Sequence, residues 1–550
     1  MSMKRAAAAV GLAVELAWAG TSLAAIAEPV RIETGWVSGG ATNDPSVTVF
    51  RGLPYAAPPV GDLRWRPPAA PARWEGVRNA DQRGNICPQP AGGGAGNGLT
   101  MSEDCLNVDV WTAAASSSER RPVMVWFHGG NAGMGAGTGP QQDGEPLASK
   151  GVVLVNVNFR AGPLGHLASP ELSRESGHSA SGNYGTMDCI AALRWVKTNI
   201  AAFGGDPDNV TIFGQSFGAG TEHFITLSPL SAGLFNKVIY QSHAHYAHDP
   251  ELMSIGSAYR TKKQAEADGV IYENVLGTHD LKALRAMPWQ KLMDAYSATA
   301  LAENAEARKN GATGISWLYS LDGYVVPRNY SQSYALGVHT DAPVMAGNNH
   351  DEGGASPDTA WDLVAQGTKL RAAFPAFTSL KEYLDWAHAK FGSMTARFLE
   401  LYPAASDREA FFSSSAAARD SNKNSTWMWA SDWKKRNTQA AYLYFWTHGA
   451  SGPNHDLQGA SHGSELAFIF GHPAQGWTQD DLRIADMMQR YWTNFARTGN
   501  PNGPGLPEWK PFDGSTAQLM ELGEHFQAIP LADKVKLAFW KSFFASQPAL

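Results

Sequence analysis

The middle of the chain alternates between short apolar runs and segments with helical periodicity. Residues 123–127 and 152–157 are almost wholly apolar and rich in valine, which is typical of strands covered on both faces. Between residues 186 and 203, apolar side chains recur every three or four positions, as on one face of a helix. Strands separated by helices predict an α/β fold, in which a large, mostly parallel central sheet carries helices on both faces. Further apolar runs predict strands at 209–213, 235–240, 343–346 and 441–446.

The composition supports a folded chain with a large core. Of the 550 residues, 43% are hydrophobic and only 17% are charged, which excludes an intrinsically disordered chain. The formal net charge is -7 and basic blocks are absent from the sequence, which argues against nucleic acid as a partner. Because no repeat or long linker interrupts the pattern, we expect residues 28–550 to form one domain. Its long loop and helical excursions, including 249–322 and 358–420, are expected to determine specificity.

The first 27 residues are typical of a signal peptide. Lys4 and Arg5 precede an apolar stretch at 6–19, which Glu15 interrupts, and Ala25-Ile26-Ala27 fits a cleavage site. We expect cleavage after Ala27 and a secreted or periplasmic protein; a buried helix or a membrane anchor is the alternative. No later run reaches the roughly 18 apolar residues that span a bilayer. No stable membrane anchor is therefore expected.

The cysteines fit an exported protein. Cys87 and Cys105 are 18 positions apart and flank a glycine-rich stretch, so in an oxidising compartment they are expected to form a disulfide. Cys189 lies in the helix predicted over 186–203, where a buried free thiol is favoured over a catalytic one. Three cysteines without a CxxC pair do not make a zinc site.

The strongest chemical signal is Gly214-Gln215-Ser216-Phe217-Gly218, which follows a predicted strand and precedes a predicted helix. G-x-S-x-G in that context indicates a sharp turn that exposes the serine hydroxyl above the carboxyl edge of the sheet. Glycine is needed on either side because neighbouring backbone passes too close for a Cβ. An ordinary glycine-rich strand-to-helix turn is the alternative interpretation.

Motifs spread over nearly the whole chain resemble the type-B carboxylesterase and cholinesterase family. They include FRGLPYA at 50–56, SEDCLNV at 102–108, GNYG at 182–185, FGGDP at 203–207 and TGNPN at 498–502. The resemblance implies the α/β-hydrolase fold and ester hydrolysis by a Ser-His-Glu triad. In that fold the triad partners follow the nucleophile in the order acid, then histidine.

The resemblance also implies which residues complete the triad. The family's acid motif matches residues 347–353, after a predicted strand, and assigns the acid to Glu352; Asp351 is the alternative orienting group. Its histidine loop matches residues 459–466 and assigns the base to His462. The family's oxyanion loop matches 128–131, so donors are expected from the N–H groups of Gly130 and Asn131, together with that of Phe217.

Several positions depart from the family pattern. Asn131 replaces a usual glycine, and Phe217 replaces a usual alanine. Gln215 replaces a usual glutamate, which removes a negative charge that would favour choline esters, although drift at this position is an equally good interpretation. His243 replaces a usual glycine at the inner wall of the pocket. Gly129, Gln215 and His243 are the substrate-pocket candidates, and no carboxylate or thiol completes a metal set around His243.

The sequence therefore predicts an exported serine carboxylic-ester hydrolase that forms an acyl-enzyme and needs neither cofactor nor metal. Its expected partner is a small-molecule ester, neutral or anionic rather than a choline ester. Polyester toxins and plant phenolic esters both fit this pattern. The alternative is a non-catalytic cholinesterase-like adhesion module, which is disfavoured because Ser216, Glu352 and His462 are all present.

Overall fold

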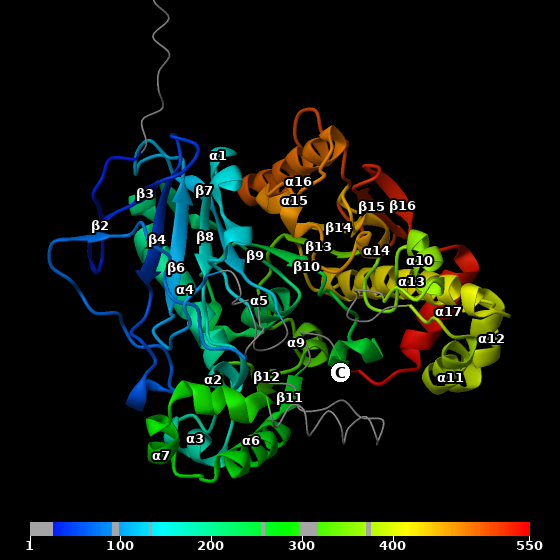
Figure 1. Ribbon diagram of the computed structural model, residues 1–550, viewed down its shortest axis with the longest axis horizontal. Coiled ribbons are helices and arrows are strands. Elements are labelled where there is room, and N and C mark those ends of the chain that lie inside the picture. Colours follow the sequence, from blue (N-terminus) through cyan, green and yellow to red (C-terminus); the bar gives the residue numbers. More distant parts are fainter. Residues whose placement is uncertain are drawn as a thin grey trace, which may run out of the picture.

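A large central sheet dominates the structure, a computed structural model that describes residues 26–90, 98–130, 135–254, 259–297, 317–369 and 376–549. Its 11 strands lie in the order β16-β15-β14-β13-β10-β9-β7-β8-β6-β4-β3 (Figure 1). Their bounds are β3 Gly40–Ala41, β4 Thr48–Pro54, β6 Asn107–Thr112, β7 Arg121–Phe127, β8 Val153–Val157, β9 Gly205–Gln215, β10 Lys237–Gln241, β13 Val344–Asn349, β14 Ala441–Trp446, β15 Gln518–Leu522 and β16 Gln527–Pro530.

The centre of this sheet is parallel and its edges are antiparallel. Strands β8, β7, β9, β10, β13, β14 and β15 pair in parallel, whereas β3, β4, β6 and β16 pair antiparallel with their neighbours. All of the strands predicted from apolar runs lie in the parallel centre, to within a few residues at their ends. The prediction of a mostly parallel α/β sheet is confirmed.

Alternating side chains of each central strand enter two different cores. On β7, Val123 and Val125 pack in a cluster with the helices α4 (Tyr184–Asn199) and α5 (Phe217–Leu227). Met124 and Trp126 face the other way and pack with the helices α15 (Leu466–Phe470) and α16 (Gln479–Thr498). Such alternation is what a strand covered on both faces requires, and α4 includes most of the helix predicted over 186–203.

Two helical excursions extend away from the sheet, each around its own apolar cluster (Figure 1). One contains α3 (Pro170–Glu175), α6 (Lys262–Leu276) and α7 (Leu281–Ala286). The other contains α11 (Leu380–Phe391), α12 (Thr395–Leu401), α17 (Lys534–Ala545) and part of α13 (Asp407–Lys434). The remaining elements are α1 Glu145–Ser149, α2 Gly162–His166, α9 Tyr330–Leu336, α10 Trp361–Ala365, α14 His455–Gln458, and the small-sheet strands β1 Val30–Ile32, β2 Gly35–Ser38, β5 Val77–Asn79, β11 Tyr259–Thr261 and β12 Tyr319–Leu321.

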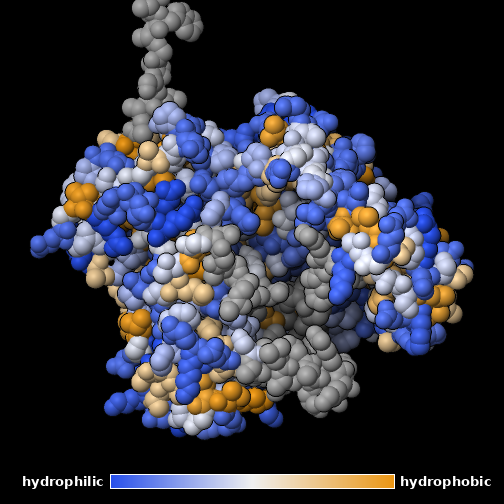
Figure 2. All heavy atoms as spheres, viewed as in Figure 1, coloured by the Kyte–Doolittle hydropathy of each residue, from blue (hydrophilic) through white to orange (hydrophobic). Residues whose placement is uncertain are grey.

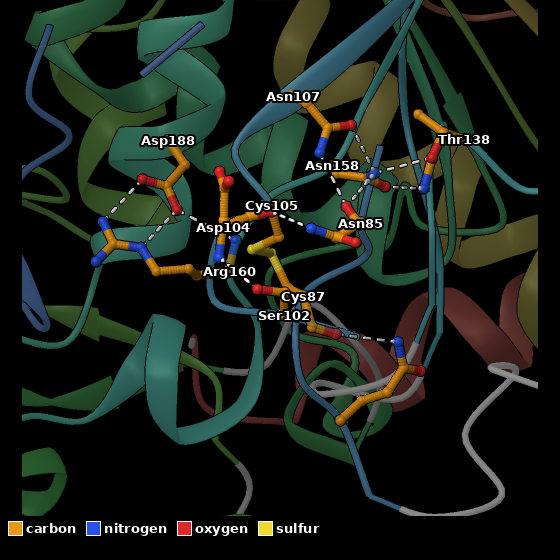
Figure 3. The surroundings of a disulfide bond; sticks show 12 residues. Asn85, Cys87, Ser102, Asp104, Cys105, Asn107, Thr138, Asn158, Arg160 and Asp188 are labelled. Atoms are coloured by element: carbon orange, nitrogen blue, oxygen red, sulfur yellow. Dashed lines mark hydrogen bonds and ion pairs between the residues drawn. A yellow bond between two sulfur atoms is a disulfide. The ribbon is translucent and has the colours of Figure 1, made fainter. Parts of the chain in front are cut away.

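Cys87 and Cys105 form the expected disulfide (Figure 3). Cys189 is a buried free thiol on α4, and burial raises its pKa well above the ordinary value, so it stays protonated and unreactive. Both cysteine predictions are confirmed.

The surface seen in Figure 2 is largely polar, and its apolar residues are scattered in small groups. Most of the predicted signal peptide, residues 1–25, lies outside the described residues. Among the helices that the structure does describe, none is both long and apolar enough to cross a membrane.

Candidate active site

Ser216 stands on a tight turn between β9 and α5. Its backbone has φ 57° and ψ -120°, a conformation that non-glycine residues rarely adopt and that is concentrated at functional sites. The flanking glycines are sterically required. A Cβ on Gly218 would lie 2.0 Å from the carbonyl oxygen of Phe127, and one on Gly214 would lie 2.8 Å from the same atom. The sharp turn predicted from G-x-S-x-G is therefore present.

Glu352 and His462 meet although 110 positions separate them in the sequence. Glu352 follows β13, and His462 lies in the loop between α14 and α15. The Nδ1 atom of His462 lies 3.1 Å from Oε2 of Glu352, while Oε1 of Glu352 accepts the N–H of Asn349 at 2.9 Å. The Glu352 side chain is 10% exposed and that of His462 is 46% exposed. The imidazole is thus accessible and has a buried carboxylate behind it.

Asp351 makes a different set of contacts. Its Oδ2 accepts the N–H of Ala460 at 2.9 Å, and its own N–H donates to the carbonyl of Ala460 at 3.0 Å. Its Oδ1 accepts from Arg419 at 2.8 Å and lies 2.9 Å from Nδ1 of His350. Asp351 therefore fastens the acid loop to the histidine loop, while Glu352 is the carboxylate that contacts His462.

A second buried carboxylate supports this pair. Oε1 of Glu465 accepts from Gln241 at 3.0 Å and Oε2 accepts from Asn349 at 2.6 Å. Burial raises the pKa of Glu465 in spite of these hydrogen bonds. Burial alone would lower the pKa of His462, but the charge and hydrogen bond of Glu352, with the charge of Glu465, raise it. The imidazolium is thereby stabilised.

The reciprocal effect acts on Glu352. Burial would raise the pKa of this carboxyl, but the charge of His462 and hydrogen bonds from His462 and Asn349 lower it overall. Glu352 is therefore ionised at neutral pH. An ionised acceptor at Nδ1 fixes the proton of the neutral imidazole on that nitrogen and leaves Nε2 as an acceptor.

The contact on Nε2 of His462 was not predicted from the sequence. Nε2 of Gln215 lies 3.1 Å from it, and the Gln215 side chain is buried at 5% exposure. Within the described residues, no hydrogen bond joins Oγ of Ser216 to His462. The only signal for this contact in the sequence was that Gln215 departs from the family pattern immediately before the serine.

The predicted oxyanion loop lies against the serine turn. A Cβ on Gly129 would lie 2.7 Å from the carbonyl oxygen of Gln215 and 3.5 Å from Cβ of Ser216, so this loop and the turn are in close contact. Gly130 has φ 114°, which favours glycine. Phe217 is the first residue of α5, so its N–H has no acceptor within the helix. Asn131 lies outside the described residues.

The large side chain at position 217 fits because it points into the core. Phe217 is 1% exposed. Its ring stacks on Phe159 and Tyr319, with ring centroids 6.4 Å and 5.5 Å away, and meets His166 edge-on at 5.8 Å. The departure from the usual alanine is thus accommodated by an aromatic cluster behind the serine turn.

A cavity of about 340 Å³ opens beside Gln215 and His462. Gly129, Gly130 and His128 line it, and burial lowers the pKa of His128 to about 4, so that this imidazole is neutral. The described residues that line the cavity include no Asp, Glu, Lys or Arg. They are Leu99, Trp126, His128, Gly129, Gly130, Gly135, Ala136, Gly139, Pro140, Gln141, Gln142, Gln215, His462, Gly463 and Leu466.

His243 is buried beside a second histidine and does not line this cavity. It is 1% exposed, and its Nε2 lies 3.2 Å from Nδ1 of His223, whose Nε2 lies 2.6 Å from the hydroxyl of Tyr334. Burial lowers the pKa of both imidazoles, that of His223 to about 3. No cluster of three or more ligating side chains suited to a metal occurs among the described residues.

Comparisons with known proteins match this chain to esterases over almost its whole length. The model of the carboxylesterase family matches residues 27–540. Fumonisin B1 esterase of Sphingopyxis macrogoltabida is 33% identical, over 95% of this chain and 92% of that protein. Para-nitrobenzyl esterase of Bacillus subtilis (strain 168) is 32% identical, over 90% of this chain and 94% of that protein. Among solved structures, a PNB esterase superposes with a TM-score of 0.74 and 28% identity, over 94% of this chain and 99% of that one.

Proposed function

The chain belongs to the carboxylesterase family, has the α/β-hydrolase fold and is a carboxylic-ester hydrolase; from this premise we propose that Ser216, His462 and Glu352 form its catalytic triad. The observation that carries the proposal is the contact of 3.1 Å between Nδ1 of His462 and the Glu352 carboxylate, in loops that flank the strained turn of Ser216. Nucleophile, base and orienting carboxylate are the parts that acyl transfer requires.

In the proposed reaction, Ser216 Oγ attacks the ester carbonyl while Nε2 of His462 takes its proton. The imidazolium is stabilised by Glu352 and then gives the proton to the leaving alcohol, which leaves an acyl-enzyme on Ser216. Water repeats the sequence and releases the acid. The N–H groups of Gly130, Asn131 and Phe217 are the proposed donors to the oxyanion, where removing one donor commonly costs about 3 kcal/mol of transition-state stabilisation.

We propose that the substrate is an uncharged or anionic ester. The support is the cavity beside His462, whose described lining carries no carboxylate, together with the neutral side chain of Gln215 where the family usually has glutamate. A choline ester would lack an attractive charge there. Relatives whose names specify fumonisin B1 and phenmedipham as substrates favour a natural-product or xenobiotic ester.

We also propose that the protein is exported, either secreted or periplasmic, after cleavage behind Ala27. The disulfide between Cys87 and Cys105 supports this proposal because such bonds persist in oxidising compartments. N-terminal sequencing of the exported protein tests it, and a mature chain that begins before Glu28 would contradict the proposed site.

The proposed mechanism is tested by rapid mixing of the enzyme with a neutral nitrophenyl ester. A burst of nitrophenol approaching the enzyme concentration is expected, because nitrophenol is a good leaving group and the acyl-enzyme accumulates when it forms faster than water hydrolyses it. Ser216→Ala is expected to abolish the burst while the circular-dichroism spectrum stays that of the unmodified enzyme. A full burst from Ser216→Ala would contradict the proposal.

A further inference from the structure

The carboxamide of Gln215 is held in a confined place between two loops. A Cβ on Gly129 would lie 2.9 Å from its Oε1, and one on Gly463 would lie 3.6 Å from its Cδ. Glycine at 129 is what leaves room for the amide, whereas a Cβ at 463 would be in ordinary van der Waals contact with it. Because Gln215 is the last residue of β9, its backbone is fixed by the sheet, and the side chain is directed at Nε2 of His462 with a separation of 3.1 Å.

The chemistry of the two groups decides which of them donates. Nδ1 of His462 faces Glu352, which is ionised and can only accept, so the proton of the neutral imidazole is on Nδ1. Nε2 then carries a lone pair and can only accept, and the amide N–H of Gln215 is the group that donates to it. The imidazolium would have N–H groups on both nitrogens, and it could not accept this hydrogen bond.

We propose that Gln215 is a positioning residue that holds His462 as the neutral base by donating its amide N–H to the nitrogen that takes the proton of Ser216. The proposal rests on the triad role proposed above for His462. During the reaction, the Ser216 hydroxyl replaces the amide as the donor to Nε2. The amide therefore keeps the ring unprotonated and in place until Ser216 reacts.

Other charged groups near His462 show why a neutral amide matters here. The charges of Glu352 and Glu465 already favour the imidazolium, whereas Asp351 is engaged by Arg419 and His350. His128 in the cavity wall is neutral, and His245, after β10, is paired with Asp249. A glutamate at position 215 would place a further negative charge beside Nε2 of His462. Opposite charges at such separations shift a pKa by about 1–3 units, so the base would remain protonated and inactive at higher pH.

The experiment measures how fast a neutral organophosphonate labels Ser216 as a function of pH, alongside kcat/KM for a neutral ester. The acid limb of either profile reports the pKa of the base in the free enzyme. Gln215→Glu is expected to move this limb to higher pH by about 1 unit or more. Gln215→Met, which fills similar space without a donor, is expected to move it in the same direction by less. Gln141→Glu is the matched control, because Gln141 lines the same cavity and is exposed, and it is expected to shift the limb least.

The outcomes separate this inference from the proposed function. If Ser216 of the unmodified enzyme is not labelled at any pH, the proposed triad is wrong. If Ser216 is labelled but Gln215→Glu keeps the acid limb of the unmodified enzyme, the positioning role is wrong. If Gln215→Glu does not fold, Gln215→Met decides, and an unchanged acid limb in that variant would likewise overturn the inference.

Discussion

Two histidine sites in this molecule show that the surroundings of an imidazole decide whether it can accept a proton in a reaction or only packs in the core. At the first site, the ring of His462 is 46% exposed and contacts an ionised carboxylate, and its pKa is raised. At the second, His223 and His243 are 2% and 1% exposed, hydrogen-bond to each other and, through His223, to the hydroxyl of Tyr334, and their pKa values are lowered by burial. A proton acceptor needs both access to substrate and stabilisation of its charged form, and of these three histidines His462 alone has both.

The largest expected difference between the two sites is in turnover. His462→Ala is expected to lower kcat by about 10^4- to 10^6-fold, because removal of the base of a triad has effects of that size. His243→Ala is expected to act mainly on the fold, since it leaves Nδ1 of buried His223 without its partner, at a cost of about 1–3 kcal/mol in unfolding free energy. Steady-state kinetics and urea denaturation of both variants provide the comparison. Equal losses of kcat with intact folds would place His243 in the reacting site.

The carboxylates beside the first site give the next largest effect. Glu352→Gln is expected to lower kcat by about 10^4-fold, because the imidazole loses both its orienting acceptor and the stabilisation of its charge. Asp351→Asn is the matched control. Its carboxylate joins two loops and Arg419, so we expect lower stability and a smaller loss of kcat. A larger loss of kcat from Asp351→Asn would exchange the two assignments.

We expect the buried pair of His223 and His243 to make the free energy of unfolding depend on pH. Histidine in the unfolded chain titrates near pH 6.5, whereas the folded pKa values of His223 and His243 lie below this. The unfolded chain therefore takes up protons that the folded one cannot, and stability is lost as the pH falls below about 6.5. Between about pH 6.5 and its own folded pKa, each of these two residues is expected to lower the free energy of unfolding by about 1.4 kcal/mol for each unit that the pH falls. Urea unfolding of the unmodified enzyme and of His243→Gln measures this slope; equal slopes would contradict a neutral His243 in the fold.

The smallest expected effect concerns the charge of the substrate at the first site. Gln215→Glu adds a negative charge, and two charges about 6 Å apart at an effective dielectric of about 20 interact by roughly 2.8 kcal/mol. Water and salt weaken this repulsion, so we expect kcat/KM for an ester with a free carboxylate to fall about ten-fold more than for its methylated analogue. The ratio cancels any damage to His462, which both esters share. Equal losses would leave Gln215 without a role in charge preference.

Features that depend on residues close together in the sequence could be predicted, whereas contacts between residues far apart in the sequence could not. The turn of Ser216 was predictable because a strand, two glycines and a helix within a few residues determine it. The bond between Gln215 and His462 spans 247 positions, and the support of Glu465 by Gln241 spans 224. No local pattern encodes such contacts, because they depend on where the loops after β10, β13 and β14 meet.

His243 shows that a departure from the family pattern does not by itself reveal which residues surround a side chain. A histidine in place of a usual glycine suggested a pocket residue, but the sequence did not show that α5 brings His223, and α9 brings Tyr334, next to it. The parallel sheet, the two cores and the disulfide were predictable because apolar runs, helical periodicity and cysteine spacing act over short distances.

The central claim, that Ser216 and His462 act as one unit, is tested most directly by a double-mutant cycle on kcat for a neutral nitrophenyl ester. Once either residue is lost, the other has no partner for proton transfer. We therefore predict that the double variant Ser216→Ala/His462→Ala is no slower than the slower of the two single variants. Losses that multiply, so that the double variant is slower by the product of both factors, would show that the two residues act independently and would contradict the account.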